Sequence, residues 1–419
     1  MEDILKVLMM GGQRAGKTSV LSGLVDTMVN GDVQNLISVQ DITALEGSGR
    51  NLAKHIESLK YHLLTSQDKT FLIDDNKTSA FDNYVLQFAI PGTSSKMNIK
   101  FTDANGEFFD MGRSHDLEIR ELVEQYDVFV IAIDTPFLME AVNPDNKLCN
   151  EAINNSYNHV NDIHDFLTSL DDKNGADAKL VIFAPLKCEK WAKEGRYDEV
   201  VQRVEQVYES TLLALSKYVN VEVDIMPIQT VGSIVFVEQL KALMCSADGG
   251  KPIRSAVIDN KTKVRFEDGR VEDIDMTRHK FSKDQEAVIR EGSILLRPNS
   301  WFKTIEKNYD PHNCDQLAFY VLQFYLGKVL FAQKVEDLQK NKSRWKWTKI
   351  ILTALDLFCG LLVGDLVAPS TATYLSRKFG TIKIEQMQTL MKKIQDGGYV
   401  KINCEGIKTI QSSKLYSLK

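Results

Sequence analysis

The sequence lacks paired cysteines, a surplus of basic residues and the residue patterns of a zinc site or a Ser-His-Asp hydrolase. Its six cysteines are scattered without a C-x-x-C pair, which disfavours a zinc site or a disulfide framework and fits a reducing cytoplasm. Lys and Arg number 51 against 57 Asp and Glu, so the net charge of −6 gives no sign of nucleic-acid or membrane binding by the whole molecule. No Ser-His-Asp arrangement is apparent, and the spacing of His159 and His164 fits one helix face poorly.

The beginning of the sequence also lacks the basic-then-apolar pattern of a secretory signal. Residues 2 and 3 are acidic, and the apolar run that follows is interrupted by Lys6 and closed by a glycine pair. We expect a buried first strand here instead. With 419 residues, 43% of them hydrophobic, the chain can bury a large core divided over two or three domains, as in a soluble globular protein.

The strongest pattern is a strand, a glycine-rich loop and a helix in direct succession. Residues 4–10 are apolar except for Lys6, residues 11–18 read G-G-Q-R-A-G-K-T, and helical apolar spacing follows. Glycines let successive backbone N–H groups of such a loop point at a phosphate, and the helix start favours negative charge. Lys17 would span the β- and γ-phosphates, while the Thr18 hydroxyl would bind Mg²⁺. The predicted phosphate-binding residues are Gly11, Gly12, Gln13, Arg14, Ala15, Gly16, Lys17, Thr18 and Ser19.

Apolar segments spaced along the chain predict the sheet around this loop. Residues 84–90 and 98–102 read as a hairpin, and the second strand leads into Asp103 and Gly106. Asp103 would hold a Mg²⁺-bound water, and the Gly106 N–H would reach the γ-phosphate. Three more apolar strands, 128–133, 180–184 and 223–228, alternate with helical stretches. The sequence therefore predicts an α/β fold whose mainly parallel, six-stranded sheet is covered on both faces.

This order of motifs resembles the Ras-like, translation-factor-related P-loop GTPases over about residues 1–240. Where that family reads guanine with N-K-x-D, this chain has Leu186, Lys187, Cys188 and Glu189. The resemblance implies that Glu189 accepts hydrogen bonds from guanine N1–H and the exocyclic amine, that the Lys187 stem lies along the ring, and that Thr230 lies in the loop that touches the base. The alternative for residues 187–191 is a solvated charged loop.

The resemblance also assigns the residues around the γ-phosphate. Thr78, with Thr70 as second choice, is the candidate for a switch residue whose hydroxyl binds Mg²⁺. Glu107 stands where the family often has a water-orienting Gln, so hydrolysis is expected to be slow. Lys17, Gly106 and Glu107 are thus the residues expected to act in hydrolysis. Positive charge could come from Arg14, Arg113 or Arg120, each of which is otherwise a surface or stabilising residue.

Domain boundaries in the second half of the sequence are less clear than in the first half. After the P-loop GTPase core, residues 1–234, we expect an insertion with a β-hairpin at 235–312 and a closing helix with a basic linker at 313–349. Residues 308–324 are similar to a helix entry in bacterial double-GTPase-type proteins of conflict and defence systems. Residues 350–419 are expected to form a helical and winged-helix-like domain. Its apolar stretch 350–368 favours a buried soluble helix over membrane contact, because it contains two aspartates.

The winged-helix-like segment carries a local positive charge. Residues 377–419 hold nine Lys or Arg and three acids, for a charge of +6. They could bind DNA phosphates, or bind only protein. The sequence as a whole predicts a cytoplasmic, Mg²⁺-dependent switch that binds GTP and GDP, hydrolyses GTP and relays its nucleotide state to a protein partner through the C-terminal module. A P-loop ATPase or kinase, and a nucleotide-binding adaptor with little hydrolysis, are the alternatives.

Overall fold

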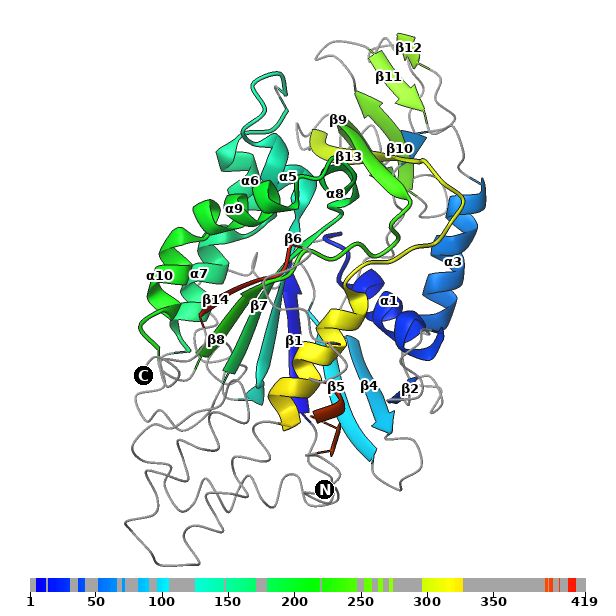
Figure 1. Cartoon of the computed structure of the whole chain (residues 1–419). Coiled ribbons are helices and arrows are strands. Elements are labelled where there is room, and N and C mark those ends of the chain that lie inside the picture. The colour runs from blue at the N-terminus through cyan, green and yellow to red at the C-terminus, as the bar shows by residue number, and fades with distance from the viewer. Residues whose placement is uncertain are drawn as a thin grey trace, which may run out of the picture.

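The computed structural model describes residues 5–12, 14–30, 37–41, 52–65, 70–71, 82–89, 96–104, 125–146, 148–170, 179–218, 221–246, 252–257, 263–266, 271–273, 296–326, 389–390, 392–394, 399 and 406–411. Its centre is a sheet in the order β14-β8-β7-β6-β1-β5-β4-β2 (Figure 1). The pairs β5-β1, β1-β6, β6-β7 and β7-β8 are parallel, and the three remaining pairs are antiparallel. The chain is therefore a mixed α/β protein with a large, mainly parallel sheet, as the sequence predicts.

The strands of the central sheet follow the predicted apolar segments closely. They are β1 (Leu5–Gly11), β2 (Ser38–Asp41), β4 (Asp82–Ala89), β5 (Lys96–Asp103), β6 (Val128–Asp134), β7 (Lys179–Leu186), β8 (Val221–Ile225) and β14 (Lys408–Gln411). The prediction of six strands is wrong by two, because β2 and β14 extend the sheet at its two edges. Both have only four residues, too few to produce a recognisable apolar alternation.

Alternate residues of β1, β6 and β7 enter different cores. On β1, Leu5, Val7 and Met9 face one core while Leu8 and Met10 face the other, as a strand's period of two requires. Burial on both faces explains why these segments are continuously apolar.

Helices cover both faces of the sheet. The described helices are α1 (Lys17–Asn30), α3 (Leu52–Thr65), α5 (Thr135–Glu140), α6 (Glu151–Tyr157), α7 (Val160–Thr168), α8 (Glu189–Lys193), α9 (Tyr197–Val207) and α10 (Glu209–Leu215), with residues 314–326 also helical. Apolar side chains of α1 and of the 314–326 helix belong to one core, and those of α7, α9 and α10 to the other. Among the described residues, no helix is long and apolar enough to cross a membrane.

A second sheet stands above the carboxyl edge of the first (Figure 1). Its order is β12-β11-β10-β9-β13-β3, and the pairs along it are antiparallel. The strands are β9 (Ile234–Ser246), β10 (Pro252–Val257), β11 (Lys263–Phe266), β12 (Val271–Asp273), β13 (Leu296–Thr304) and β3 (Thr70–Phe71). All but β3 come from the stretch in which the sequence predicts an inserted β-rich segment. The short β3 joins from far earlier in the chain.

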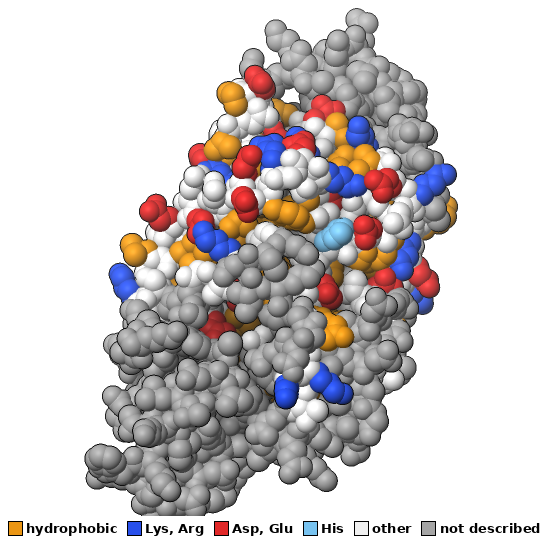
Figure 2. All heavy atoms as spheres, viewed as in Figure 1, with side chains coloured by type: hydrophobic (Ala, Val, Ile, Leu, Met, Phe, Trp, Pro, Cys, Tyr) orange, Lys and Arg blue, Asp and Glu red, His pale blue; other side chains and the backbone are white. Residues whose placement is uncertain are grey.

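Parts of the C-terminal stretch pack on the central sheet. β14 runs antiparallel to β8, and Leu390, Ile394 and Ile407 lie in the same core as the 314–326 helix. Lys408, a residue of the basic stretch, forms an ion pair with Glu205 of α9 at 2.8 Å. Residues 350–388, 391, 395–398, 400–405 and 412–419 of the predicted winged-helix-like domain lie outside the described part of the chain. Over the face shown in Figure 2, acidic and basic side chains of the described residues are interspersed.

Candidate nucleotide-binding site

The glycine-rich loop joins β1 to α1 at the carboxyl edge of the central sheet. Its backbone turns through positive φ angles at Gly11 (134°), Arg14 (61°) and Gly16 (108°). A Cβ atom on Gly11 would lie 2.2 Å from the carbonyl oxygen of Ala132 on β6, so only glycine fits there. The tight exit of β1 therefore depends on the absence of a side chain.

The Lys17 side chain lies inside the glycine-rich loop and is hydrogen-bonded to it. Its ammonium donates hydrogen bonds to the carbonyls of Gly11 and Gly12, each at 3.1 Å, although the side chain starts from the first turn of α1. Only 6% of Lys17 is exposed. A buried ammonium held by its own loop is placed to bind an anion against the backbone N–H groups around it.

Thr18 and Asp103 lie together beside this loop. Asp103 ends β5, where its partner in the parallel ladder is Met9 of β1, and it is fully buried. The Thr18 hydroxyl donates to its carboxylate at 2.6 Å. A hydroxyl and a carboxylate oxygen are the protein ligands that Mg²⁺ accepts when phosphate oxygens and water complete its shell, so the two residues fit the ion. Among the described residues, no group of three or more His, Cys, Asp or Glu side chains could hold a metal by itself.

Lys187 links the loop after β7 to the phosphate loop. It has a left-handed backbone (φ 59°), and its ammonium donates to the Arg14 carbonyl and to the Asp134 carboxylate, the latter at 2.7 Å. The side chain of Leu186, one residue earlier, would contact a Cβ on Gly16 at 3.5 Å. The loop that begins at Lys187 therefore lies directly against the phosphate loop.

Glu189 begins α8 and is almost completely buried, with 1% of its surface exposed. Within the described part of the chain, neither of its carboxylate oxygens makes a hydrogen bond of ordinary geometry. Burial is the main cause that raises the pKa of Glu189 to about 7. The backbone N–H groups of Val231 and Gly232, its own N–H and the charge of Lys187 oppose this rise only in part. The alternative of a solvated loop is wrong for Glu189, and for Trp191, which is 2% exposed.

Thr230 lies in the loop after β8, next to the backbone that faces Glu189. The flanking Gln229 pairs with His312 through both backbone hydrogen bonds, at 3.0 and 2.9 Å. Gly232 has a φ of 78°, and a Cβ there would lie 1.7 Å from the Asp310 carbonyl oxygen. These contacts fix the loop beside the start of α8, so the structure brings Thr230 and Glu189 to one region.

Several predicted site residues lie outside the described part of the chain: Gln13, Thr78, Gly106 and Glu107, together with Arg113 and Arg120. Their roles remain predictions. Thr70, the second choice for the switch residue, belongs to β3, and its backbone pairs with Lys303 of the second sheet.

Asp134 is the site residue that the sequence interpretation missed. It ends β6 at the same sheet edge as Asp103 and holds Lys187 by an ion pair, with 9% of its side chain exposed. An acid at the end of a buried parallel strand was the available signal, since the same reasoning identified Asp103.

No protein-family model matches the chain, and no curated protein matches it. Similar solved structures include the signal recognition particle receptor SRb-GTP/SRX complex from Chaetomium thermophilum, at 14% identity and a TM-score of 0.32, covering 55% of this chain and 93% of that one. The GTP-bound Ski7 GTPase-like domain of S. cerevisiae has 16% identity and a TM-score of 0.27, covering 54% and 43%. Sup35 complexed with GDP has 12% identity and a TM-score of 0.24, covering 55% and 38%. These TM-scores are below 0.5, so the likeness assigns no function to this chain.

Proposed function

We propose that the protein is a Mg²⁺-dependent GTP-binding switch that hydrolyses GTP slowly and relays its nucleotide state to a protein partner. The single observation that carries the choice of guanine is the buried Glu189 carboxylate, which makes no ordinary hydrogen bond within the described residues. The choice of a nucleoside triphosphate rests on the phosphate loop and on the Thr18–Asp103 pair.

The phosphate end of the site is supported by two arrangements that meet at one sheet edge, the loop with Lys17 and the Thr18–Asp103 pair. The loop backbone and Lys17 would bind the phosphate oxygens, because N–H groups and an ammonium both donate hydrogen bonds to anions. Thr18 and Asp103 would hold Mg²⁺, which supplies positive charge opposite the β- and γ-phosphates.

The base end is supported by the chemistry of Glu189. A carboxylate only accepts hydrogen bonds, and guanine presents two adjacent donors, N1–H and the exocyclic amine, whereas adenine presents an acceptor at N1. A buried acceptor pair would thus bind guanine and reject adenine, since adenine would leave a buried charge unsatisfied. Lys187 would hold the base-binding loop against the phosphate loop, because its ammonium donates a hydrogen bond to the Arg14 carbonyl.

Hydrolysis and relay are the further parts of the proposal. Glu107 would be the residue beside the attacking water, where its negative charge explains slow turnover. The protein partner would bind the segments that respond to the γ-phosphate, around Thr78 and Gly106, or the C-terminal stretch. DNA binding by that stretch is less favoured, since Lys408 is already ion-paired with Glu205.

Calorimetry with GDP and ADP in the presence of Mg²⁺ tests the proposal. We expect GDP to bind at least about 100-fold more tightly than ADP, because a site built on polar groups strongly rejects a mismatched donor pattern. Lys17→Ala should abolish binding of both. Equal affinities for GDP and ADP would refute the guanine assignment, and unchanged binding by Lys17→Ala would refute the phosphate site.

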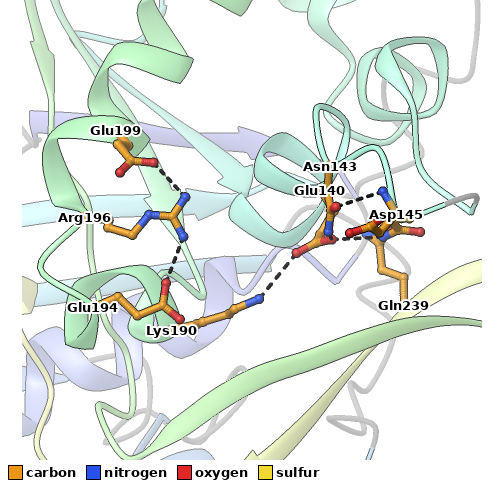
Figure 3. Close-up of polar contacts among 9 residues, drawn as sticks. Glu140, Asn143, Asp145, Lys190, Glu194, Arg196, Glu199 and Gln239 are labelled. Carbon is orange, nitrogen blue, oxygen red and sulfur yellow. Dashed lines mark hydrogen bonds and ion pairs between the residues drawn. The ribbon is translucent and has the colours of Figure 1, made fainter.

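The substitution Glu189→Gln sharpens the test. A glutamine side chain offers one acceptor and one donor, which suits xanthine, where a carbonyl oxygen replaces the exocyclic amine of guanine. We expect the variant to lose GDP affinity and gain affinity for xanthosine diphosphate. Glu194→Gln is the matched control, because Glu194 caps the same helix but pairs at the surface with Arg196 (Figure 3). A variant that keeps the guanine preference of the parent would contradict the role of Glu189.

A further inference from the structure

The second sheet reaches the nucleotide site through one aromatic side chain. Phe302 of β13 lies with its ring centroid 5.9 Å from the Lys187 ammonium. That ammonium already bonds the Arg14 carbonyl and the Asp134 carboxylate, and the ring adds a third contact, the attraction between a cation and a π face. Lys187 therefore meets the phosphate loop, the central sheet and the second sheet together.

The backbone places Phe302 at an irregular point of its sheet. The pairing of β13 with β9 shifts register between Trp301 and Phe302, so that Trp301 pairs with Glu238 but Phe302 pairs with Phe236. A bulge of this kind re-aims the side chains next to it. Phe302 is 2% exposed and packs edge-on against the ring of Phe236, with centroids 6.2 Å apart. Its ring is thus packed in place within cation–π distance of the Lys187 ammonium.

The second sheet is also fixed to the helix that starts with Glu189. Trp191 of α8 stacks on Phe236 of β9 with ring centroids 5.8 Å apart, and the Lys190 ammonium lies over both rings. Lys190 also forms an ion pair with Glu140 of α5 at 3.5 Å (Figure 3). The sheet and the base-side loop are therefore in contact at both Lys187 and α8.

On the other side, Phe302 pairs with the segment that precedes β4. Its backbone lies opposite Phe71 of β3, and β3 belongs to the stretch in which a γ-phosphate-sensing threonine is predicted. The same residue thus connects Lys187 with a strand from the predicted switch region.

We propose that Phe302 is a positioning residue of the nucleotide site, which holds Lys187 against the phosphate loop so that docking of the second sheet slows nucleotide release. This inference rests on the proposed function and extends it, because it makes the second sheet part of the binding machinery. Replacing Phe302 removes a contact of Lys187 but none of the groups proposed to bind the nucleotide.

The test measures GDP dissociation from the full chain carrying Phe302→Leu, Phe302→Tyr or Phe129→Leu. Phe129 is the matched control, because it is a fully buried phenylalanine with an edge-on aromatic partner, Phe166, in the same core. We expect Phe302→Leu to speed GDP release about 2- to 30-fold, the range of a cation–π contact from exposed to desolvated sites. Phe302→Tyr keeps the π face and should release GDP at the parent rate, and so should Phe129→Leu.

A double-mutant cycle with Lys187→Met separates positioning from general stability. If Phe302 acts through Lys187, adding Phe302→Leu to Lys187→Met speeds release no further. Additive effects, or equal effects of Phe302→Leu and Phe129→Leu, would overturn the inference while leaving GDP binding by the parent intact. Failure of the parent to bind GDP would instead refute the proposed function and, with it, this extension. If Phe302→Leu does not fold, Phe302→Met fills the space without a ring and carries the same expectations.

Discussion

Acidification should weaken guanine-nucleotide binding through Glu189. Binding to guanine N1–H and the amine requires the ionised carboxylate, but burial raises the pKa of Glu189 to about 7 in the nucleotide-free protein. At about pH 5.5 only about 3% of Glu189 is ionised, so the Kd for GDP should be about 30-fold higher than at about pH 8.5. This ratio corresponds to about 2 kcal/mol.

Fluorescence titration with a labelled GDP over this pH range measures the effect. The phosphates of GDP also change protonation over this pH range. The Glu189→Gln variant has no carboxyl at this position, so the pH dependence of its GDP affinity measures the contribution of the phosphates. We expect the parent's affinity to fall about tenfold per unit below about pH 7, relative to the variant. Parallel pH profiles for parent and variant would refute the reasoning, because Glu189 would then not be the base-binding acid.

The same pKa shift has the opposite effect on the stability of the nucleotide-free protein. The folded chain holds the Glu189 proton more tightly than the unfolded chain, where the pKa is about 4.5. The stability gained is fully present below about pH 4.5 and is lost as the pH rises through about 7. The glutamine side chain of Glu189→Gln stays neutral at every pH. In urea unfolding, the free energy of unfolding of this variant should therefore exceed that of the parent by up to about 3 kcal/mol at about pH 8, and should show no such gain at about pH 4.5.

Three further perturbations follow from the geometry. Arg14→Gly should raise the free energy of unfolding by about 1 kcal/mol in chemical denaturation, because a left-handed backbone strains any residue with a Cβ; a destabilised variant would contradict this. Mg²⁺ should slow GDP release, and Asp103→Asn should raise the Mg²⁺ concentration needed for half of this effect by about 10- to 100-fold, because one charged partner of the ion is lost. An unchanged Mg²⁺ midpoint would show that Asp103 is not part of the metal site. Thr409→Val should destabilise the protein by about 1.5 to 3 kcal/mol at about pH 8 and less at about pH 5. The Thr409 hydroxyl donates to Asp224 at 2.7 Å, and burial raises the pKa of that acid to about 7, so the bond favours the form present at high pH; a pH-independent loss would refute it.

The central sheet could be predicted because its strands are buried on both faces. Segments such as β6 and β7 are therefore apolar apart from one charged residue at an end, Asp134 and Lys179, and local sequence is enough to recognise them. The edge strands lie where one side is open, so β2 and β14 carry polar residues and give no such signal. The pairing of β3 with β13 joins Phe71 to Phe302, and no local pattern records a contact between segments so far apart.

The candidate site divides in the same way. The phosphate loop could be predicted because its geometry depends on consecutive residues and on glycines that no other residue can replace. Asp103 followed from its position at a strand end. The burial of Glu189 could not be predicted, because the neighbouring charged residues Lys187 and Lys190 are typical of a solvated loop. Burial arises from Val231, Gly232 and the second sheet, which are brought to α8 only by the fold.

Strain in the backbone points to the same edge of the sheet. Among the described residues, four non-glycine positions have positive φ: Arg14, His159, Lys187 and Asn313. Arg14 and Lys187 are hydrogen-bonded to each other, the His159 ring would lie 3.7 Å from a Cβ on Gly12, and Asn313 donates to the Pro227 carbonyl at 2.8 Å. Each left-handed residue costs about 1 kcal/mol or more, and such costs persist where the surrounding contacts over-determine the backbone. Arg14 and Lys187 belong to the loops after β1 and β7, so the placement of their strain supports a binding site at the carboxyl edge.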